Sequence, residues 1–325
     1  MLVLALALMS LMSAAGLWAF IRLAPSVELV DQPNHRSLHA TPTPVGGGAV
    51  PVLLIAGYLW ISSSIVGAPG VAGLLLVLCA IGLGDDRWGL PSAPRFLIYL
   101  LAGIALPWLI LPIEPPVAAM PLLGFLALGV GVAWCINLFN FMDGADGLAA
   151  AQLTSVSLGL GLIATFGGTD AQALTKCCGA LFAATLPLLA FNWHPAKVFM
   201  GDAGAVPLGF FLAVLGLLAG SVDTALGIAW CILMMPFLVD TGITLCWRVL
   251  SGEAPHVAHR DHAYQRLVLR FGGPLPVTLG LMAMQTLWQF PLAVTAANDL
   301  LFPPLLVFLS AIPSLLVLVY TRLGQ

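Results

Sequence analysis

The sequence has 325 residues, of which 60% are hydrophobic and 8% are charged, with a mean hydropathy of +1.04. Soluble domains carry about 25% charged residues, so this composition excludes a soluble globular protein and indicates a surface that mostly faces lipid. The formal net charge of −3 is small, and no nucleic-acid partner is expected. None of the six cysteines belongs to a CxxC pair, which argues against a zinc site and against a disulfide framework.

Apolar stretches of membrane-spanning length occur along the whole chain. They lie near residues 2–22, 46–66, 69–84, 95–113, 119–137, 148–166, 172–191, 205–222, 226–247, 274–296 and 301–320. The first is expected to be a retained span and not a signal peptide, because the first basic residue, Arg22, follows it. The sequence therefore predicts an all-α, polytopic membrane bundle of about eleven helices, forming a single domain over residues 1–325.

The placement of the basic residues predicts the orientation of this bundle. With the N-terminus outside, ten of the eleven Lys and Arg residues lie on or beside inner connections, and only Lys176 lies outside. This distribution follows the positive-inside rule and suits a bacterial plasma membrane. The inner connections lie near residues 23–45, 85–94, 138–147, 192–204 and 248–273. Because the polar residues suited to catalysis occur in the same connections, the functional site is expected at the cytoplasmic face.

The first inner connection combines charged residues with glycines. Arg36 and His39 precede three glycines, 46–48, where the next helix is expected to begin. Glycines at a helix start allow backbone amides to approach a phosphate closely, so Arg36 and His39 are candidate substrate-binding residues. The alternative is a turn-rich connector whose glycines serve close helix packing.

The second inner connection opens with the adjacent carboxylates Asp85 and Asp86. Adjacent carboxylates repel each other at a membrane boundary, and a divalent cation or a shared proton relieves that repulsion. Both are candidate catalytic residues, and Asp86 is also a candidate metal ligand. The alternative is a solvated helix end in which Arg87 is the partner.

The third inner connection carries Asn137, Asn140, Asp143 and Asp146 at every third position. On a helix these side chains would form a polar stripe continuing from an apolar span, which is costly without a binding partner. Two interspersed glycines favour a broken helix, which also suits the approach of a ligand. All four residues are candidates for substrate binding.

The fourth inner connection places Asn192 and Lys197 shortly before Asp202. A carboxylate, a lysine and neighbouring glycines suit a site for Mg²⁺ and a diphosphate. The alternative role of Asp202 is an N-cap of the next helix.

The fifth inner connection holds His256, His259 and His262, with Arg260 among them. This spacing suits zinc or anionic oxygens, and phosphate contact is the preferred interpretation because the other connections indicate hard oxygen chemistry. Asp240 lies within the preceding span. A carboxylate at that depth is expected to be paired or to help hold the site.

The combined set of residues predicts phosphoryl transfer. Several Asp residues suit Mg²⁺, several Arg, His and Lys residues suit phosphates, and such transfer depends on positioning and charge neutralisation. One substrate is expected to be a lipid, because the connections lie where a headgroup would reach them.

Four segments, in this order, resemble the polyprenyl-phosphate N-acetylhexosamine-1-phosphate transferase family, glycosyltransferase family 4. They are the Asp85-Asp86 pair, the Asn-x-x-Asn-x-x-Asp-Gly-x-Asp-Gly segment from Asn137, the Met200-Gly201-Asp202-x-Gly204 segment, and the histidine-containing fifth connection. The resemblance covers most of the chain. It implies transfer of a sugar 1-phosphate from a UDP-N-acetyl-sugar to undecaprenyl phosphate, with release of UMP. It also implies Mg²⁺ as the cofactor, with Mn²⁺ as the alternative ion.

The resemblance further implies roles for individual residues. Asp202 would bind Mg²⁺, and Asp85 or Asp86 would deprotonate the lipid phosphate. Direct attack by the lipid phosphate and a covalent aspartyl-phosphate intermediate are both open, and direct attack is favoured because Mg²⁺ and positioning suffice. The remaining implied substrate contacts are Asp143 and Asp146 at the nucleotide or metal end, and His259, Arg260 and His262 at the donor diphosphate.

The spacing of His259 and His262 is more open than in much of the family and resembles the O-antigen-initiating branch. It implies a donor such as an N-acetylglucosamine, N-acetylquinovosamine or N-acetylfucosamine nucleotide. A homodimer is open as the assembly within the membrane lipid. The rival hypothesis is a transporter of an anionic or nucleotide-linked solute, because intramembrane Asp residues and broken helices also suit transport.

Overall fold

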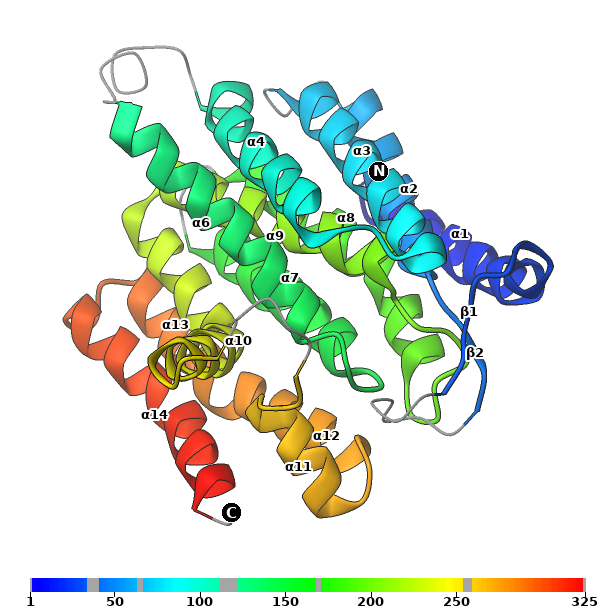
Figure 1. Ribbon diagram of the computed structural model, residues 1–325. Coiled ribbons are helices and arrows are strands. Elements are labelled where there is room, and N and C mark those ends of the chain that lie inside the picture. Colours follow the sequence, from blue (N-terminus) through cyan, green and yellow to red (C-terminus); the bar gives the residue numbers. More distant parts are fainter. Residues whose placement is uncertain are drawn as a thin grey trace.

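The computed structural model describes residues 2–33, 41–62, 67–111, 122–167, 171–253 and 259–323. Its architecture is the expected all-α bundle (Figure 1). The helices are α1 (Leu2–Leu23), α2 (Ala49–Ile61), α3 (Ala68–Trp88), α4 (Ser92–Ile110), α6 (Leu122–Phe141), α7 (Leu148–Phe166), α8 (Gln172–Asn192), α9 (Asp202–Val222), α10 (Thr224–Leu250), α11 (Ala263–Phe271), α12 (Leu275–Met284), α13 (Phe290–Ala297) and α14 (Pro303–Arg322). The remaining elements are the 3₁₀-helix η1 (Ala24–Val27), the π-helical turn η2 (Gln285–Gln289), and the antiparallel strands β1 (Val30–Asp31) and β2 (Thr43–Pro44).

Within these ranges, ten helical segments are long and apolar enough to cross a membrane, and α2 is a shorter apolar helix of 13 residues. Together they match the predicted multi-pass bundle. The expected short third span is in fact 21 residues long, because α3 continues through Asp85 and Asp86 to Trp88. Those carboxylates can stay helical because both have hydrogen-bond partners from other parts of the chain.

Helix α9 lies at the centre of the bundle. It contacts α2, α3, α4, α6, α7, α8 and α10, and 72% of its apolar span is buried, compared with 17% for the span that begins with α1. Glycines allow its N-terminus to approach its neighbours. A Cβ atom on Gly82 of α3 would lie 2.2 Å from the carbonyl oxygen of Asp202, and one on Gly48 would lie 2.4 Å from the Cα of Gly204. Backbone packing therefore fixes where α9 begins.

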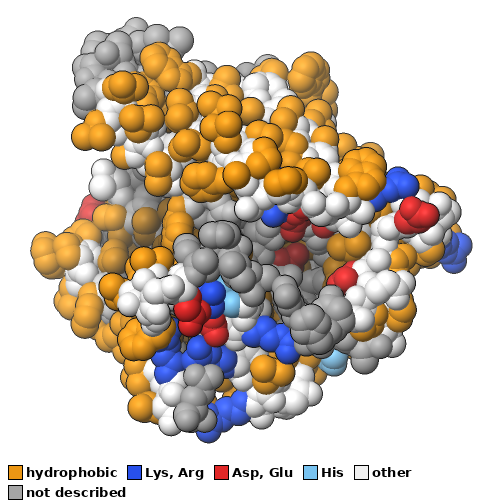
Figure 2. Space-filling view, viewed as in Figure 1, with side chains coloured by type: hydrophobic (Ala, Val, Ile, Leu, Met, Phe, Trp, Pro, Cys, Tyr) orange, Lys and Arg blue, Asp and Glu red, His pale blue; other side chains and the backbone are white. Residues whose placement is uncertain are grey.

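The C-terminal helices form a second group that packs against this centre. Helix α10 packs against α9, α13 and α14, and α12 packs against α7. Figure 1 shows α11 and the C-terminal end of α14 on the side of the bundle where the turn between α6 and α7 lies. Charged side chains of both signs gather on this side, with acidic groups inside a hollow, whereas the upper part of the same view is hydrophobic (Figure 2).

Candidate active site

The carboxylate of Asp86 joins the end of α3 to the start of α9. It accepts hydrogen bonds from the backbone N–H of Asp202 at 2.8 Å and of Ala203 at 3.0 Å. The first N–H groups of a helix have no partner within the helix, so Asp86 supplies this cap from another helix. Gly201 precedes α9 with φ 69°, and a Cβ there would lie 2.6 Å from Asp86 Oδ2. Only glycine fits between the cap and the helix that it caps.

Arg95 bridges the two other carboxylates of this cluster. Its Nη1 donates to Asp202 Oδ2 at 2.8 Å and also to Asp85 Oδ2. The other oxygen of Asp85 accepts from the backbone N–H of Leu90 at 2.6 Å. From the sequence alone, Arg95 is only one of the basic residues of the inner face, and its role between two carboxylates could not be predicted from hydropathy. Its position in the first turn of α4, a short connection after the acidic pair, is a signal that could have identified it.

The glycine-rich end of the first inner connection lies against the segment before Asp202. The backbone N–H of Gly47 donates to the Phe199 carbonyl and that of Gly48 to the Met200 carbonyl, both at 2.9 Å. In the described residues these glycines thus serve backbone pairing and helix packing, which was the alternative interpretation of this connection. Arg36 and His39 lie outside the described residues.

Asp143 lies in the turn between α6 and α7, beside the same cluster. Burial raises the pKa of its carboxyl well above the usual range, and the negative charge of Asp86 raises it further. A hydrogen bond from the backbone N–H of Gly201 acts in the opposite direction. Asp143 is therefore a half-buried carboxylate whose charged form is favoured by a cation or a further donor.

Asp146 and Asn192 hold the third and fourth connections together. Asp146 Oδ2 is hydrogen-bonded to His194 Nδ1 at 2.6 Å and accepts from the Ala196 N–H at 3.1 Å. Asn192 is buried, accepts from the Gly147 N–H at 2.9 Å, and donates to the Val198 carbonyl at 2.9 Å. These contacts position the loops.

Three further candidates of these connections have contacts of other kinds. Asn137 donates to the Ala133 carbonyl of its own helix at 2.8 Å. The Asn140 carbonyl accepts from the Asp143 N–H at 3.1 Å and begins the turn. Lys197 is exposed, and its backbone N–H donates to the Phe191 carbonyl at 2.9 Å.

The fifth connection is anchored by Asp240. This carboxylate accepts from the backbone N–H of Ala263 at 2.9 Å and of Tyr264 at 3.1 Å, which are the first N–H groups of α11. His262 is 2% exposed, and its Nδ1 lies 3.3 Å from Asp240. The structure thus places His262 against a carboxylate of the bundle, in addition to the role at the diphosphate that the sequence suggested.

His259 and Arg260 lie just before this anchor. The His259 ring stacks on His262 with centroids 4.9 Å apart. Burial, followed by the neighbouring His262 and Arg248, lowers the pKa of His259 to about 4. His259 is therefore neutral near pH 7 and offers a hydrogen bond instead of a positive charge. Arg260, the next residue, is half-buried.

The donor atoms of the acidic cluster fit Mg²⁺ in chemical type, because this ion prefers carboxylate oxygens. The candidates are Asp86 and Asp202, with Asp143 beside Asp86. Among the described residues, no three His, Cys, Asp or Glu side chains are grouped as a preformed metal cage. A Mg²⁺ ion commonly retains waters and substrate phosphates as ligands, so a complete protein cage is not required.

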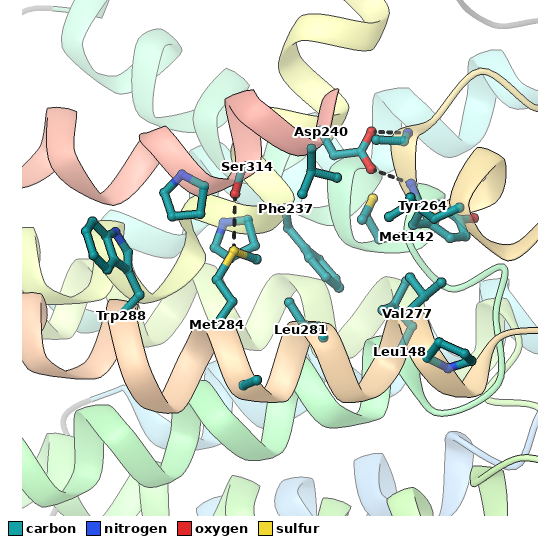
Figure 3. A pocket seen from close by; sticks show the side chains of 18 of the residues that line it. Met142, Leu148, Phe237, Asp240, Tyr264, Val277, Leu281, Met284, Trp288 and Ser314 are labelled. Carbon is teal, nitrogen blue, oxygen red and sulfur yellow. Dashed lines mark hydrogen bonds between the residues drawn. The ribbon is translucent and has the colours of Figure 1, made fainter. Parts of the chain in front are cut away.

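An apolar cavity of about 480 Å³ lies beside the histidine connection. Its walls come from α10, α11, α12 and α14, and Asp240 and Tyr264 lie at one end of it (Figure 3). Trp288 lies at the opposite end (Figure 3), and both Trp288 and its neighbour Leu287, which also lines the cavity, have exposed side chains. The cavity thus extends from exposed apolar side chains to the polar connections.

Comparison with known proteins gives a consistent result. The family described as glycosyl transferase family 4 matches residues 68–220. A probable undecaprenyl-phosphate N-acetylglucosaminyl 1-phosphate transferase of Bacillus subtilis (strain 168) is 30% identical over 264 residues, covering 76% of this chain and 72% of the relative.

Two further relatives have names that differ in the lipid or in the sugar. A decaprenyl-phosphate N-acetylglucosaminephosphotransferase of Mycolicibacterium smegmatis is 30% identical over 316 residues, covering 85% of this chain and 76% of the relative. A phospho-N-acetylmuramoyl-pentapeptide-transferase of Acaryochloris marina is 31% identical over 256 residues, covering 70% and 66%. All three relatives are named as transferases of a phosphorylated N-acetyl amino sugar, and the first two names also specify a polyprenyl phosphate.

Proposed function

The chain belongs to glycosyl transferase family 4, and we propose that it transfers N-acetylhexosamine 1-phosphate from a UDP-N-acetyl-sugar to undecaprenyl phosphate. An oxygen of the lipid phosphate attacks the sugar-bearing phosphorus of the donor, the bridging P–O bond breaks, and UMP leaves. N-acetylglucosamine is the proposed sugar, because two of the relatives above are named for it.

The observation that carries this proposal is that carboxylate-bearing segments of three separate inner connections converge at the start of α9. Asp85 and Asp86 come from the end of α3, Asp202 from the start of α9, and Asp143 from the turn after α6. Phosphoryl transfer needs positioned charges more than it needs covalent chemistry. A cluster of carboxylates beside Arg95 is better suited to binding a metal ion and a diphosphate than to a purely structural role.

The proposed roles follow from this arrangement. Asp86 and Asp202 would hold Mg²⁺, or Mn²⁺ as the alternative, which when bound neutralises charge on the donor diphosphate. Asp85 or Asp86 accepts the proton of the lipid phosphate, and Asp143 and Asp146 face the nucleotide or metal end. The other proposed substrate contacts are Arg36, His39, Asn137, Asn140, Asn192, Lys197, His259, Arg260 and His262.

The apolar cavity supports a lipid acceptor. Its walls suit the part of a prenyl chain nearest the phosphate, while the rest of a long chain would lie among membrane lipids. With the prenyl chain in this cavity, the lipid phosphate would lie near Asp240 and Tyr264, close to the polar connections. This path is the physical reason to prefer a lipid phosphate over a soluble acceptor.

We further propose a bacterial inner membrane location with the site facing the cytoplasm, supported by the distribution of the basic residues. The use of the product to initiate an O-antigen-type polysaccharide rests on the histidine spacing alone. A homodimer is compatible with this proposal and forms no part of the chemistry.

The test is UMP release by purified protein in detergent, with undecaprenyl phosphate, Mg²⁺ and a panel of UDP-N-acetyl-sugars. We expect release that needs both the lipid phosphate and the metal, stops with EDTA, and collapses in Asp202→Asn. The transporter alternative is not favoured, because the relatives are named as transferases. Folded protein that releases no UMP with any donor would overturn the proposed function.

A further inference from the structure

Asp240 stands apart from the acidic cluster and is a buried acidic group to which the chemistry above gives no part. It lies in α10, four residues after Pro236, and is 7% exposed. A carboxylate at this depth is costly unless its oxygens are hydrogen-bonded. Its hydrogen-bond partners therefore indicate which part of the chain Asp240 positions.

Both oxygens of Asp240 face the start of α11. Oδ1 accepts from the Ala263 N–H at 2.9 Å and lies 3.3 Å from His262 Nδ1, while Oδ2 accepts from the Tyr264 N–H at 3.1 Å. Figure 3 shows the two bonds from backbone N–H groups to Asp240 at the end of the apolar cavity. The short α11 is thus capped by a side chain of a membrane-spanning helix, and not by a residue of its own connection.

A second contact ties the start of α11 to the third inner connection. The Tyr264 hydroxyl donates to the Phe141 carbonyl at 3.0 Å, two residues before Asp143. Burial raises the pKa of Tyr264 above its usual range, so the hydroxyl remains a donor at physiological pH. The position of α11 is therefore linked on one side to Asp240 and on the other to the turn that carries Asp143.

We infer that Asp240 is a positioning residue that holds the start of α11, and with it His259, Arg260 and His262, in register with the Asp143 turn. This inference rests on the proposed function. The carboxylate also faces Nδ1 of His262, so it orients that ring and leaves Nε2 as the nitrogen that can act elsewhere. Residues that orient an active group in this way typically change affinity or activity by about 10- to 100-fold when removed.

The test compares Asp240→Ala with Asp223→Ala. Asp223 caps the first turn of α10, its Oδ1 accepting from the Ala225 N–H at 2.8 Å, and it lies at the opposite end of the same helix. Both variants therefore lose a helix cap, but only one loses contact with the histidine connection. We expect Asp240→Ala to raise the KM for the UDP-sugar by about 10-fold or more, with the KM for the lipid phosphate unchanged, and Asp223→Ala to leave both values unchanged.

Hydrogen–deuterium exchange gives a readout that does not depend on turnover. We expect faster exchange in peptides covering residues 259–266 of Asp240→Ala, and no change there in Asp223→Ala. If Asp240→Ala does not fold, Asp240→Asn and Tyr264→Phe replace it, since each weakens one side of the linkage. We expect a smaller rise in donor KM from each.

Two failures are distinguishable. A wild-type protein that releases no UMP defeats the proposed function and the inference built on it. A wild-type protein that is active, with folded Asp240→Ala showing wild-type KM values for the donor, overturns the positioning role and leaves the proposed function intact. Unchanged exchange at residues 259–266 would also overturn it, because the cap would then not control this segment.

Discussion

Two junctions at the polar side of the bundle have the same design and differ in how they are held. At each, an Asp of a membrane-spanning helix accepts two backbone N–H groups at the start of another helix: the half-buried Asp86 caps α9, and the buried Asp240 caps α11. Helix α9 is a central membrane span fixed by glycine-mediated backbone contacts, whereas α11 is a nine-residue helix at the edge of the bundle.

The two junctions therefore contribute to the site in different ways. The Asp86 junction is rigid because its backbone segments are in direct contact. Removing the carboxylate should therefore delete a charge without changing the backbone geometry. The Asp240 junction is held by polar contacts, including the Arg248–Asp261 ion pair and the Tyr264–Phe141 hydrogen bond. Changes there are expected to shift substrate affinity, while changes at Asp86 are expected to abolish turnover.

The largest expected effect comes from Asp86→Asn. The amide keeps one acceptor oxygen but loses the charge that the acidic cluster needs, so UMP release is expected to fall about 100- to 1000-fold. Asp223→Asn, a helix-cap change at the other end of the bundle, is the control and should retain its activity. If Asp86→Asn stays close to wild type, Asp86 is a structural cap only, and the two junctions are alike.

The rigidity of the Asp86 junction is tested by Gly82→Ala. The added methyl group would lie 2.2 Å from the Asp202 carbonyl oxygen and must push α9 away. We expect a loss of about 1–3 kcal/mol, seen as a lower midpoint of thermal unfolding in detergent, together with lower activity. Gly73→Ala in the same helix meets no atom within 4 Å and should unfold at or above the wild-type temperature.

The coupling of the Asp240 junction to the third connection is tested at Gly144. A Cβ there would lie 2.2 Å from the Tyr264 hydroxyl, so Gly144→Ala is expected to raise the donor KM. Tyr264→Phe removes the clashing oxygen, and the double variant should lose less than the sum of the single variants, by about 1 kcal/mol of coupling. Additive effects in the same kinetic assay would show that the contact does not connect the two elements.

The smallest expected effect concerns pH. The pKa of His259 is lowered from 6.5 to about 4 in the folded protein, so the unfolded chain binds a proton first as pH falls. Stability should therefore decrease as pH falls from 6.5 towards 4. In His259→Gln this contribution disappears, so the unfolding temperature should fall less steeply over that window. Parallel curves for the two proteins would argue against a buried, neutral His259.

The sequence alone determined the multi-pass, all-α character of the chain, because hydropathy over about 20 residues is a local property. It also determined the order of the inner connections and the side on which most basic residues lie. It singled out Asp85, Asp86, Asp143 and Asp202 among a larger group of candidate site residues, since polar residues beside apolar spans stand out from their surroundings.

Which residues form hydrogen bonds and ion pairs with one another was decided only by the tertiary structure. Asp86 meets the N-terminus of α9 across 116 residues, and Arg95 meets Asp202 across 107, so hydropathy and periodicity contain no information about these pairs. The same holds for Asp240 and α11, and for the burial of His262, whose spacing with His259 suggested a phosphate contact. Which helices approach each other depends on glycine contacts and on side-chain caps between distant segments, and these exist only once the bundle is packed.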